Sequence, residues 1–145
     1  MSGVSGPEIG DVIARIPYAT FLGVRAEQRG DELTLILPYK EMLIGNPMLP
    51  ALHGGVVGAF MELAAIAQLS IATRGARLPK TIDITIDYMR SGKPKDTFAR
   101  ARVVRTGRRI ANVHVEAWQG ERAAPIAALH GHFLLPGDEE PASGD

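Results

Sequence analysis

The feature that most constrains the fold is the stretch of residues 54–73, which is apolar on every side. A helix without a polar face is either buried in a protein core or spans a membrane. This stretch contains Glu62 and Gln68, and an acid near the middle of a bilayer costs about 2.5–3.5 kcal/mol even on insertion scales. We therefore expect a buried central helix and no membrane segment.

Alternating patterns on both sides of this helix predict the sheet that covers it. A hairpin is expected at 23–29 and 32–38, followed after the helix by strands at 81–89, 97–106, 110–119 and 125–135. In the strand 81–89, Ile82, Ile84, Ile86 and Tyr88 are expected to point inward. Short connections between alternating strands are typical of an antiparallel sheet with one solvated face. One buried helix and one such sheet predict an α+β architecture in which the sheet curls around the helix.

The remaining segments are shorter and more polar. A helix is expected at 8–21, a loop at 39–52, and tails at 1–8 and 137–145. At 145 residues, with 46% apolar and 22% charged residues, the chain is expected to form a single domain. It has no cysteine, which excludes disulfide scaffolds, thiolate zinc sites and cysteine nucleophiles. No signal peptide is visible at the start, so we expect a cytoplasmic protein.

The net charge is zero but unevenly distributed. Residues 74–109 contain 11 of the 16 lysines and arginines and three acidic residues, a local charge of +8 that the rest of the chain balances. Such a region suggests an anionic partner, either nucleic acid or a phosphate-rich small molecule, or else a solvated sheet face. No nucleic-acid motif accompanies the charge and aromatic residues are only 6%, so we expect no nucleic acid partner.

A candidate site lies where the chain enters the apolar helix, at Leu52-His53-Gly54-Gly55. Glycines there allow close approach of a ligand, and the amides of a first helical turn, at the positive end of the helix dipole, can hold an anion or a developing oxyanion. The alternative is that the glycines only ease the turn into the helix.

Glu62 is the only ionisable residue between His53 and Arg74. A carboxylate in apolar surroundings is costly, so its presence requires a reason. It could act as a general base, or it could be a structural acid paired with an arginine across an interface.

The spacing of Gly54 and Glu62 has a consequence for assembly. Eight residues of helix span roughly 12 Å, whereas a base and an oxyanion donor must both lie about 3 Å from the same reacting group. Two helices packed antiparallel about a twofold axis can meet this requirement, and one helix cannot easily do so. If the pair is catalytic, the protein is expected to be at least a dimer.

Three histidines on two of the predicted strands could also be considered as metal ligands. His130 and His132 alternate onto one face, and His114 could face them from the neighbouring strand. A polar sheet face explains these residues without a metal, so we expect neither a metal site nor a cofactor.

The combination of His53-Gly54-Gly55 and an acid nine residues after the histidine resembles the hotdog-fold acyl-CoA thioesterases, specifically the PaaI-like group. The stretch 81–90, Thr-Ile-Asp-Ile-Thr-Ile-Asp-Tyr-Met-Arg, resembles the strand that follows the central helix in that family. The resemblance covers about residues 15–135. It implies an antiparallel sheet of five to six strands wrapped around the helix, and dimers that often pair into tetramers.

The resemblance also implies roles for individual residues. The Gly54 amide, preceded by His53, would polarise the thioester carbonyl, and Glu62 of the other subunit would act as general base or nucleophile. Thr81 would help to place the attacking water. Asn46 resembles an asparagine found upstream of the histidine, although it stands seven rather than six residues before it and is followed by Pro47 and Pro50.

In such a protein the basic region would meet the phosphates of coenzyme A, which is part of the substrate. Arg108 and Arg109, in a predicted hairpin turn, are the first candidates, followed by Arg90, Lys93, Lys95 and Arg105. The implied activity is hydrolysis of an aryl- or short- to medium-chain acyl-CoA. The alternatives are an acyl-CoA-binding sensor without activity and a hydratase or dehydratase on the same fold.

Overall fold

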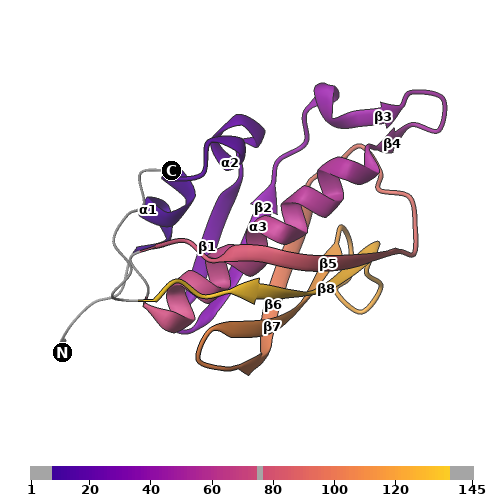
Figure 1. Ribbon diagram of the computed structural model, residues 1–145. Coiled ribbons are helices and arrows are strands. Elements are labelled where there is room, and N and C mark those ends of the chain that lie inside the picture. Colours follow the sequence, from indigo (N-terminus) through magenta and orange to yellow (C-terminus); the bar gives the residue numbers. More distant parts are fainter. Residues whose placement is uncertain (1–7, 75–76, 138–145) are drawn as a thin grey trace.

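A six-stranded antiparallel sheet curls around helix α3 (Gly54–Thr73), as Figure 1 shows. The order of the strands is β1-β2-β6-β7-β8-β5. Their bounds are β1 (Arg25–Arg29), β2 (Glu32–Leu37), β5 (Lys80–Tyr88), β6 (Thr97–Thr106), β7 (Ile110–Trp118) and β8 (Ala127–Leu134). The computed structural model describes residues 8–74 and 77–137, so the tails expected at 1–8 and 137–145 lie outside the described residues except at Glu8 and Gly137. The predicted α+β architecture is confirmed.

Helix α3 is the core of the molecule. Phe60, Met61 and Leu69 on α3 are fully buried and pack in one cluster with Val113 and Phe133 of the sheet. By length and mean hydropathy (1.7) α3 could cross a membrane, but 61% of its most apolar 18-residue stretch is buried within the fold. The apolar character of the helix is therefore explained by the sheet around it, as the sequence predicted.

One face of α3 remains incompletely covered. Val56, Ala59, Glu62 and Ile66 recur at intervals of three and four residues, which places them on one side of the helix, and each is only half-buried. Strand β5 beside them is an edge strand that pairs with β8 alone. The helix stripe and the free strand edge form an open side of the fold.

The N-terminal helix expected at 8–21 is divided into α1 (Ile9–Ala14) and α2 (Pro17–Leu22). Pro17 is the cause, because proline has no N–H to donate and disfavours a helical conformation in the residue before it. Ile16 accordingly adopts an extended conformation, with φ −109° and ψ 102°. The prediction of one continuous helix was wrong at this point.

The segment 39–52, expected to be a loop, contains the 3-10 helix η1 (Glu41–Leu43) and a two-stranded sheet of β3 (Ile44–Asn46) and β4 (Ala51–Leu52). Pro47 and Pro50 lie in the turn between the two strands, where they remove no ladder hydrogen bond. The prolines therefore end the strands without preventing them. This small sheet lies beyond the N-terminal end of α3 (Figure 1).

A β-bulge interrupts β5 near its start. Thr81 pairs with Phe133 and Asp83 with His132, so Ile82 is an extra residue on this strand. A bulge of this kind reverses the alternation of side chains on one side of it. Ile82 is consequently 50% exposed, contrary to the prediction that it points inward, while Thr81 points toward α3.

Candidate active site

The first turn of α3 leaves one backbone amide without an acceptor. Gly55 N–H donates to Nδ1 of His53 at 2.9 Å, and Val56 and Val57 N–H both donate to the His53 carbonyl oxygen, at 3.0 and 3.2 Å. Within the described part of the chain, nothing accepts from Gly54 N–H. Since the N-terminus of a helix favours negative charge, Gly54 N–H is a ready donor for an oxyanion.

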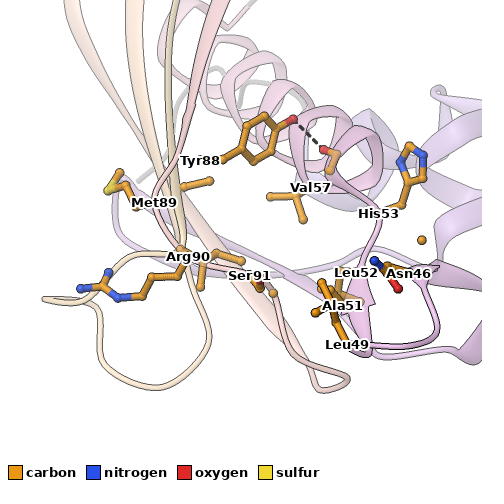
Figure 2. A pocket seen from close by; sticks show the side chains of 15 residues that line it. Asn46, Leu49, Ala51, Leu52, His53, Val57, Tyr88, Met89, Arg90 and Ser91 are labelled. Atoms are coloured by element: carbon orange, nitrogen blue, oxygen red, sulfur yellow. Dashed lines mark hydrogen bonds between the residues drawn. The ribbon is translucent and has the colours of Figure 1, made fainter.

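This amide lies at a pocket of about 510 Å³, whose lining residues are drawn in Figure 2. His53 and Asn46 contribute polar groups from one side, while Arg90 lines the opposite side with its side chain directed away from them (Figure 2) and its guanidinium donating to the Pro125 carbonyl oxygen. Much of the remaining wall is apolar and is formed by Leu49, Ala51, Leu52, Val57, Met89, Ile126 and Ala127. A pocket with apolar walls and a few converging polar groups is typical of a small-molecule site.

Asn46 reaches this pocket by way of a second bulge. Ile44 pairs with Leu52 and Asn46 with Ala51, so Gly45 is the extra residue in β3. A Cβ at position 45 would lie 2.7 Å from the Cα of His53, so glycine is required here. The side-chain oxygen of Asn46 accepts from Met48 N–H at 2.9 Å.

Glu62 and Thr81 form a second group of polar atoms. The hydroxyl of Thr81 donates to Oε2 of Glu62 at 2.6 Å, a distance typical of a charge-assisted bond. Glu62 is half-buried rather than fully buried, because it lies on the incompletely covered side of α3. The bulge at Ile82 makes the contact possible, since it turns Thr81 to the inner face.

The two groups are separated in one chain. Glu62 and Thr81 do not line the pocket at Gly54, and eight residues of helix place Gly54 and Glu62 roughly 12 Å apart. The structure therefore brings His53, Gly54 and Asn46 together at the pocket and pairs Thr81 with Glu62. Within one chain these two groups lie apart.

The basic candidates are also divided between two places. Arg90, Lys93 and Lys95 line a pocket of about 240 Å³ that shares Arg90, Ser91 and Ile126 with the larger pocket. Arg108 and Arg109 lie in the turn between β6 and β7, at the end of the sheet where β5 starts: Leu135 N–H donates to the Arg109 carbonyl oxygen, and the preceding Leu134 of β8 pairs with Lys80 of β5.

The histidines lie on the outer face of the sheet. The rings of His114 and His130 are 5.5 Å apart, and Nδ1 of His132 lies 2.9 Å from Oδ1 of Asp83. The hydrogen bond from His132 lowers the pKa of Asp83. Among residues 8–74 and 77–137, no cluster of three or more His, Asp or Glu side chains could hold a metal ion.

Sequence reasoning missed one contact at the site. The hydroxyl of Tyr88, at the end of β5, donates to the carbonyl oxygen of Gly54 at 2.7 Å (Figure 2, dashed line). The alternating pattern indicated that Tyr88 faces inward but gave no sign of its partner, because the approach depends on how β5 crosses α3.

Comparison with known proteins decides the family. The model of the thioesterase superfamily matches residues 49–126, which is more than half of the chain and includes His53, Gly54, Glu62 and Thr81. The chain belongs to this superfamily. The expected hotdog fold and the expected enzyme class, a thioester hydrolase, are thereby confirmed; the narrower PaaI-like placement stays a prediction.

Individual relatives agree with this assignment. The chain is 26% identical over 125 residues to YigI, a medium/long-chain acyl-CoA thioesterase of Escherichia coli, with 76% of this chain and 80% of the relative covered. A solved structure from Chromobacterium violaceum is 34% identical, with a TM-score of 0.72 and 90% and 91% of the two chains covered. A Bacillus halodurans protein solved with CoA has a TM-score of 0.73 at 22% identity and 89% coverage of both chains, a likeness of fold.

Proposed function

We propose that this thioesterase hydrolyses acyl-CoA, with Gly54 N–H of one subunit and Glu62 of a second subunit acting on the same thioester. The observation that supports this most directly is the unpaired Gly54 amide at an apolar-walled pocket. Membership of the superfamily, the name of YigI and the CoA complex of the Bacillus halodurans protein support the substrate class.

The open side of the fold supports a shared site. Edge strand β5 presents unpaired backbone groups, and the stripe of Val56, Ala59, Glu62 and Ile66 runs alongside it. If two copies pair β5 to β5 antiparallel, the start of one strand meets the end of the other. Thr81 and Glu62 of the partner would then lie near Tyr88 and Gly54. The dimer completes two identical sites.

The chemistry follows from the two groups. Gly54 N–H binds the carbonyl oxygen of the thioester and stabilises the negative charge that develops on it. Glu62 either removes a proton from an attacking water or attacks the carbonyl carbon itself. When water attacks, the tetrahedral intermediate collapses, the carbon–sulfur bond breaks, and the proton that Glu62 took from the water passes to sulfur, so that CoA leaves as a thiol and the acyl group as a carboxylic acid. When Glu62 attacks, the same collapse expels CoA thiolate, which takes a proton from solvent, and leaves a mixed anhydride on Glu62 that water then hydrolyses. The hydroxyl of Thr81 holds Oε2 of Glu62, which leaves Oε1 for the reaction.

Both groups of basic residues have a use in this arrangement. Arg90, Lys93 and Lys95 adjoin the pocket in the same chain, and their loop is held in place because the amide of Gln119 bonds the backbone of Lys93 and Lys95. Arg108 and Arg109 would approach the same pocket from the partner, since they lie at the other end of β5. CoA phosphates require such cations.

The pocket indicates the chemical type of the acyl group but not its length. The pocket wall is aliphatic, with Leu49, Leu52 and Val57 on one side and Met89 and Ile126 on the other. These residues suit aryl or aliphatic chains. YigI is named for medium and long chains, so the panel of substrates should extend to them.

Thiol release from short-, medium-, long-chain and aryl acyl-CoAs tests the proposal, with Glu62→Gln compared against Glu116→Gln. Glu116 is an exposed glutamate on the outer sheet face, so its variant controls for loss of one carboxylate. We expect Glu62→Gln to lose about 10²-fold or more in kcat while still binding substrate, and Glu116→Gln to match the native protein. If the native protein and both variants bind acyl-CoA tightly and none of them hydrolyses it, the sensor alternative is favoured. If the native protein adds water to an enoyl-CoA, the hydratase alternative is favoured.

A further inference from the structure

Tyr88 and His53 bind the two ends of one peptide unit. The hydroxyl of Tyr88 donates to the carbonyl oxygen of Gly54 at 2.7 Å, and the N–H of the same Gly54–Gly55 peptide donates to Nδ1 of His53 at 2.9 Å. The hydroxyl, the peptide and the imidazole therefore form a continuous chain of hydrogen bonds. Such chains strengthen cooperatively because each bond polarises the next.

This peptide lies directly beside the free amide. The Cα of Gly54 links the two groups: the carbonyl carbon of the Gly54–Gly55 peptide is bonded to this Cα, and so is the nitrogen that carries the free N–H of Gly54. Holding the plane of the Gly54–Gly55 peptide restricts the rotation of Gly54, a residue that has no side chain to restrict it. Because Nδ1 of His53 accepts a hydrogen bond, the neutral ring carries its proton on Nε2. The same bonds thus orient both the Gly54 amide and the imidazole.

The surface of α3 is shaped to admit the Tyr88 side chain. A Cβ at Gly54 would lie 3.4 Å from the Tyr88 ring, and a Cβ at Gly58, one turn later, would lie 3.2 Å from the Tyr88 hydroxyl and 2.7 Å from the side chain of Ile86. The absence of a side chain at Gly58 lets the end of β5 lie against the first turns of the helix, whereas a Cβ at Gly54 would meet the Tyr88 ring at an ordinary contact distance. Tyr88 is nevertheless 55% exposed and lines the pocket, so it is not simply a core residue.

We propose that Tyr88 is a positioning residue of the thioesterase site, which aims Gly54 N–H and His53 by holding the Gly54–Gly55 peptide. This inference rests on the proposed function for its kinetic consequence. Tyr88 itself need not touch the reacting atoms. Its contribution is the fixed direction of a donor whose misplacement by a fraction of an ångström lowers the rate.

Kinetics of Tyr88→Phe test the proposal, because this variant keeps the ring and loses only the donor. We expect kcat to fall about tenfold with KM within about twofold of the native value, since a transition-state interaction is weakened and ground-state binding is not. Tyr18→Phe is the matched control, as Tyr18 is an exposed tyrosine on α2 that stacks on Phe21. We expect this control to retain native kcat and KM.

Gly58→Ala provides an independent perturbation. The added methyl would lie 2.7 Å from the end of the Ile86 side chain and 3.2 Å from the Tyr88 hydroxyl, so Ile86 must move and the hydroxyl must shift by a few tenths of an ångström. Alanine favours the helix over glycine, so we expect kcat to fall while the helix itself stays stable. If both variants act through the same hydrogen bond, the double variant should lose no more than the worse single one.

The amide signals of Gly54 and Gly55 in nuclear magnetic resonance spectra give a readout that does not depend on activity. Tyr88→Phe should shift both signals and increase the hydrogen exchange of Gly55 N–H, while Tyr18→Phe should leave them unchanged. An unchanged kcat in Tyr88→Phe, a change in KM alone, or unshifted glycine amides would each overturn the proposal. If the native protein hydrolyses no thioester, the proposed function fails, and the amide signals still decide whether Tyr88 holds the peptide.

Discussion

Replacing Gly54 by proline removes the candidate oxyanion donor and almost nothing else. Proline lacks the backbone N–H, and Gly54 N–H has no acceptor in the described part of the chain. Gly54 is the first residue of α3, the position at which proline is best tolerated in a helix. His53 already has the extended conformation that a residue before proline requires, with φ −64° and ψ 129°. The Cβ would meet the Tyr88 ring at an ordinary contact distance of 3.4 Å.

The expected effects on stability and on activity therefore differ widely. No hydrogen bond is lost, so the free energy of unfolding should stay within about 0.5 kcal/mol of the native value. Removal of one oxyanion donor costs about 10²–10³-fold in kcat, which corresponds to roughly 2.7–4 kcal/mol of transition-state stabilisation. Gly54 lines the pocket and the proline ring adds carbon atoms there, so substrate binding is measured separately from kcat; we expect binding to be retained because the other lining residues are unchanged. The variant should be folded, able to bind acyl-CoA, and nearly inactive.

Mixing this variant with Glu62→Gln tests whether the site is shared between subunits. In a heterodimer of the two, one site combines both defects and the other combines the intact Gly54 with the intact Glu62. If co-expression gives random pairing, half of the dimers are mixed and each has one intact site of two, so activity should return to about a quarter of the native value. Thiol release from acyl-CoA measures the recovery, and each variant alone is the baseline.

Two results would refute the reasoning. Native turnover by Gly54→Pro, with the protein folded, would show that its N–H does not stabilise the oxyanion. Inactivity of the co-expressed pair, although mass spectrometry detects the heterodimer, would show that Gly54 and Glu62 act within one chain or not together.

Three further predictions concern residues around the site. Thr81→Val should lower kcat roughly tenfold or more, because a hydrogen bond to a charged group contributes about 1.5–3 kcal/mol, whereas Thr85→Val on the outer face of the same strand should leave the kinetics unchanged. Gly45→Ala should lower the melting temperature and abolish activity, since its Cβ would lie 2.7 Å from the backbone opposite; native values would show that the β3–β4 sheet can shift. Because the pKa of Asp83 is lowered in the folded state, its bond with His132 stabilises the fold above the ordinary pKa of aspartate and is lost as the pH falls below it. The difference in free energy of unfolding between the native protein and His132→Asn should therefore shrink as the pH is lowered through the range in which Asp83 is protonated.

The elements with long, unbroken patterns were predicted from the sequence. Helix α3 was predicted because apolar residues occur on every side of it, with Glu62 and Gln68 as exceptions, and β7 because apolar and polar residues alternate from Ala111 to Ala117. In β6 the alternation holds from Ala99 to Val103 and is interrupted at Val104, where the pairing with β7 is irregular. In such segments the local preferences of most residues favour the same secondary structure, so tertiary contacts seldom change it. The family resemblance then supplied the roles of individual residues.

Features that depend on a single extra residue were not predicted. Nothing in the alternation of β5 signals that Ile82 bulges, since Ile84 and Ile86 continue the same spacing after it and the reversal depends on pairing with β8. In β3 the extra residue, Gly45, lies in a segment rich in glycine and proline that was expected to be a loop. The contact of Tyr88 with Gly54 depends on the crossing of a strand and a helix that are far apart in sequence.

The hydrogen-bonding capacity of α3 shows why these local departures matter. The polar side chains in the second half of the helix are satisfied inside the fold: Gln68 donates to the Asp31 carbonyl, Ser70 to that of Ile66, and Thr73 to that of Leu69. In the described part of the chain, the Gly54 N–H and Oε1 of Glu62 have no such partner; Gly54 is exposed and Glu62 is half-buried, so both groups are accessible to a ligand. Both lie at the open side of the fold and both are bordered by β5, through Tyr88 at one end and Thr81 at the other. The same edge strand that is free to pair with a second copy therefore holds the two groups that a second copy would bring together.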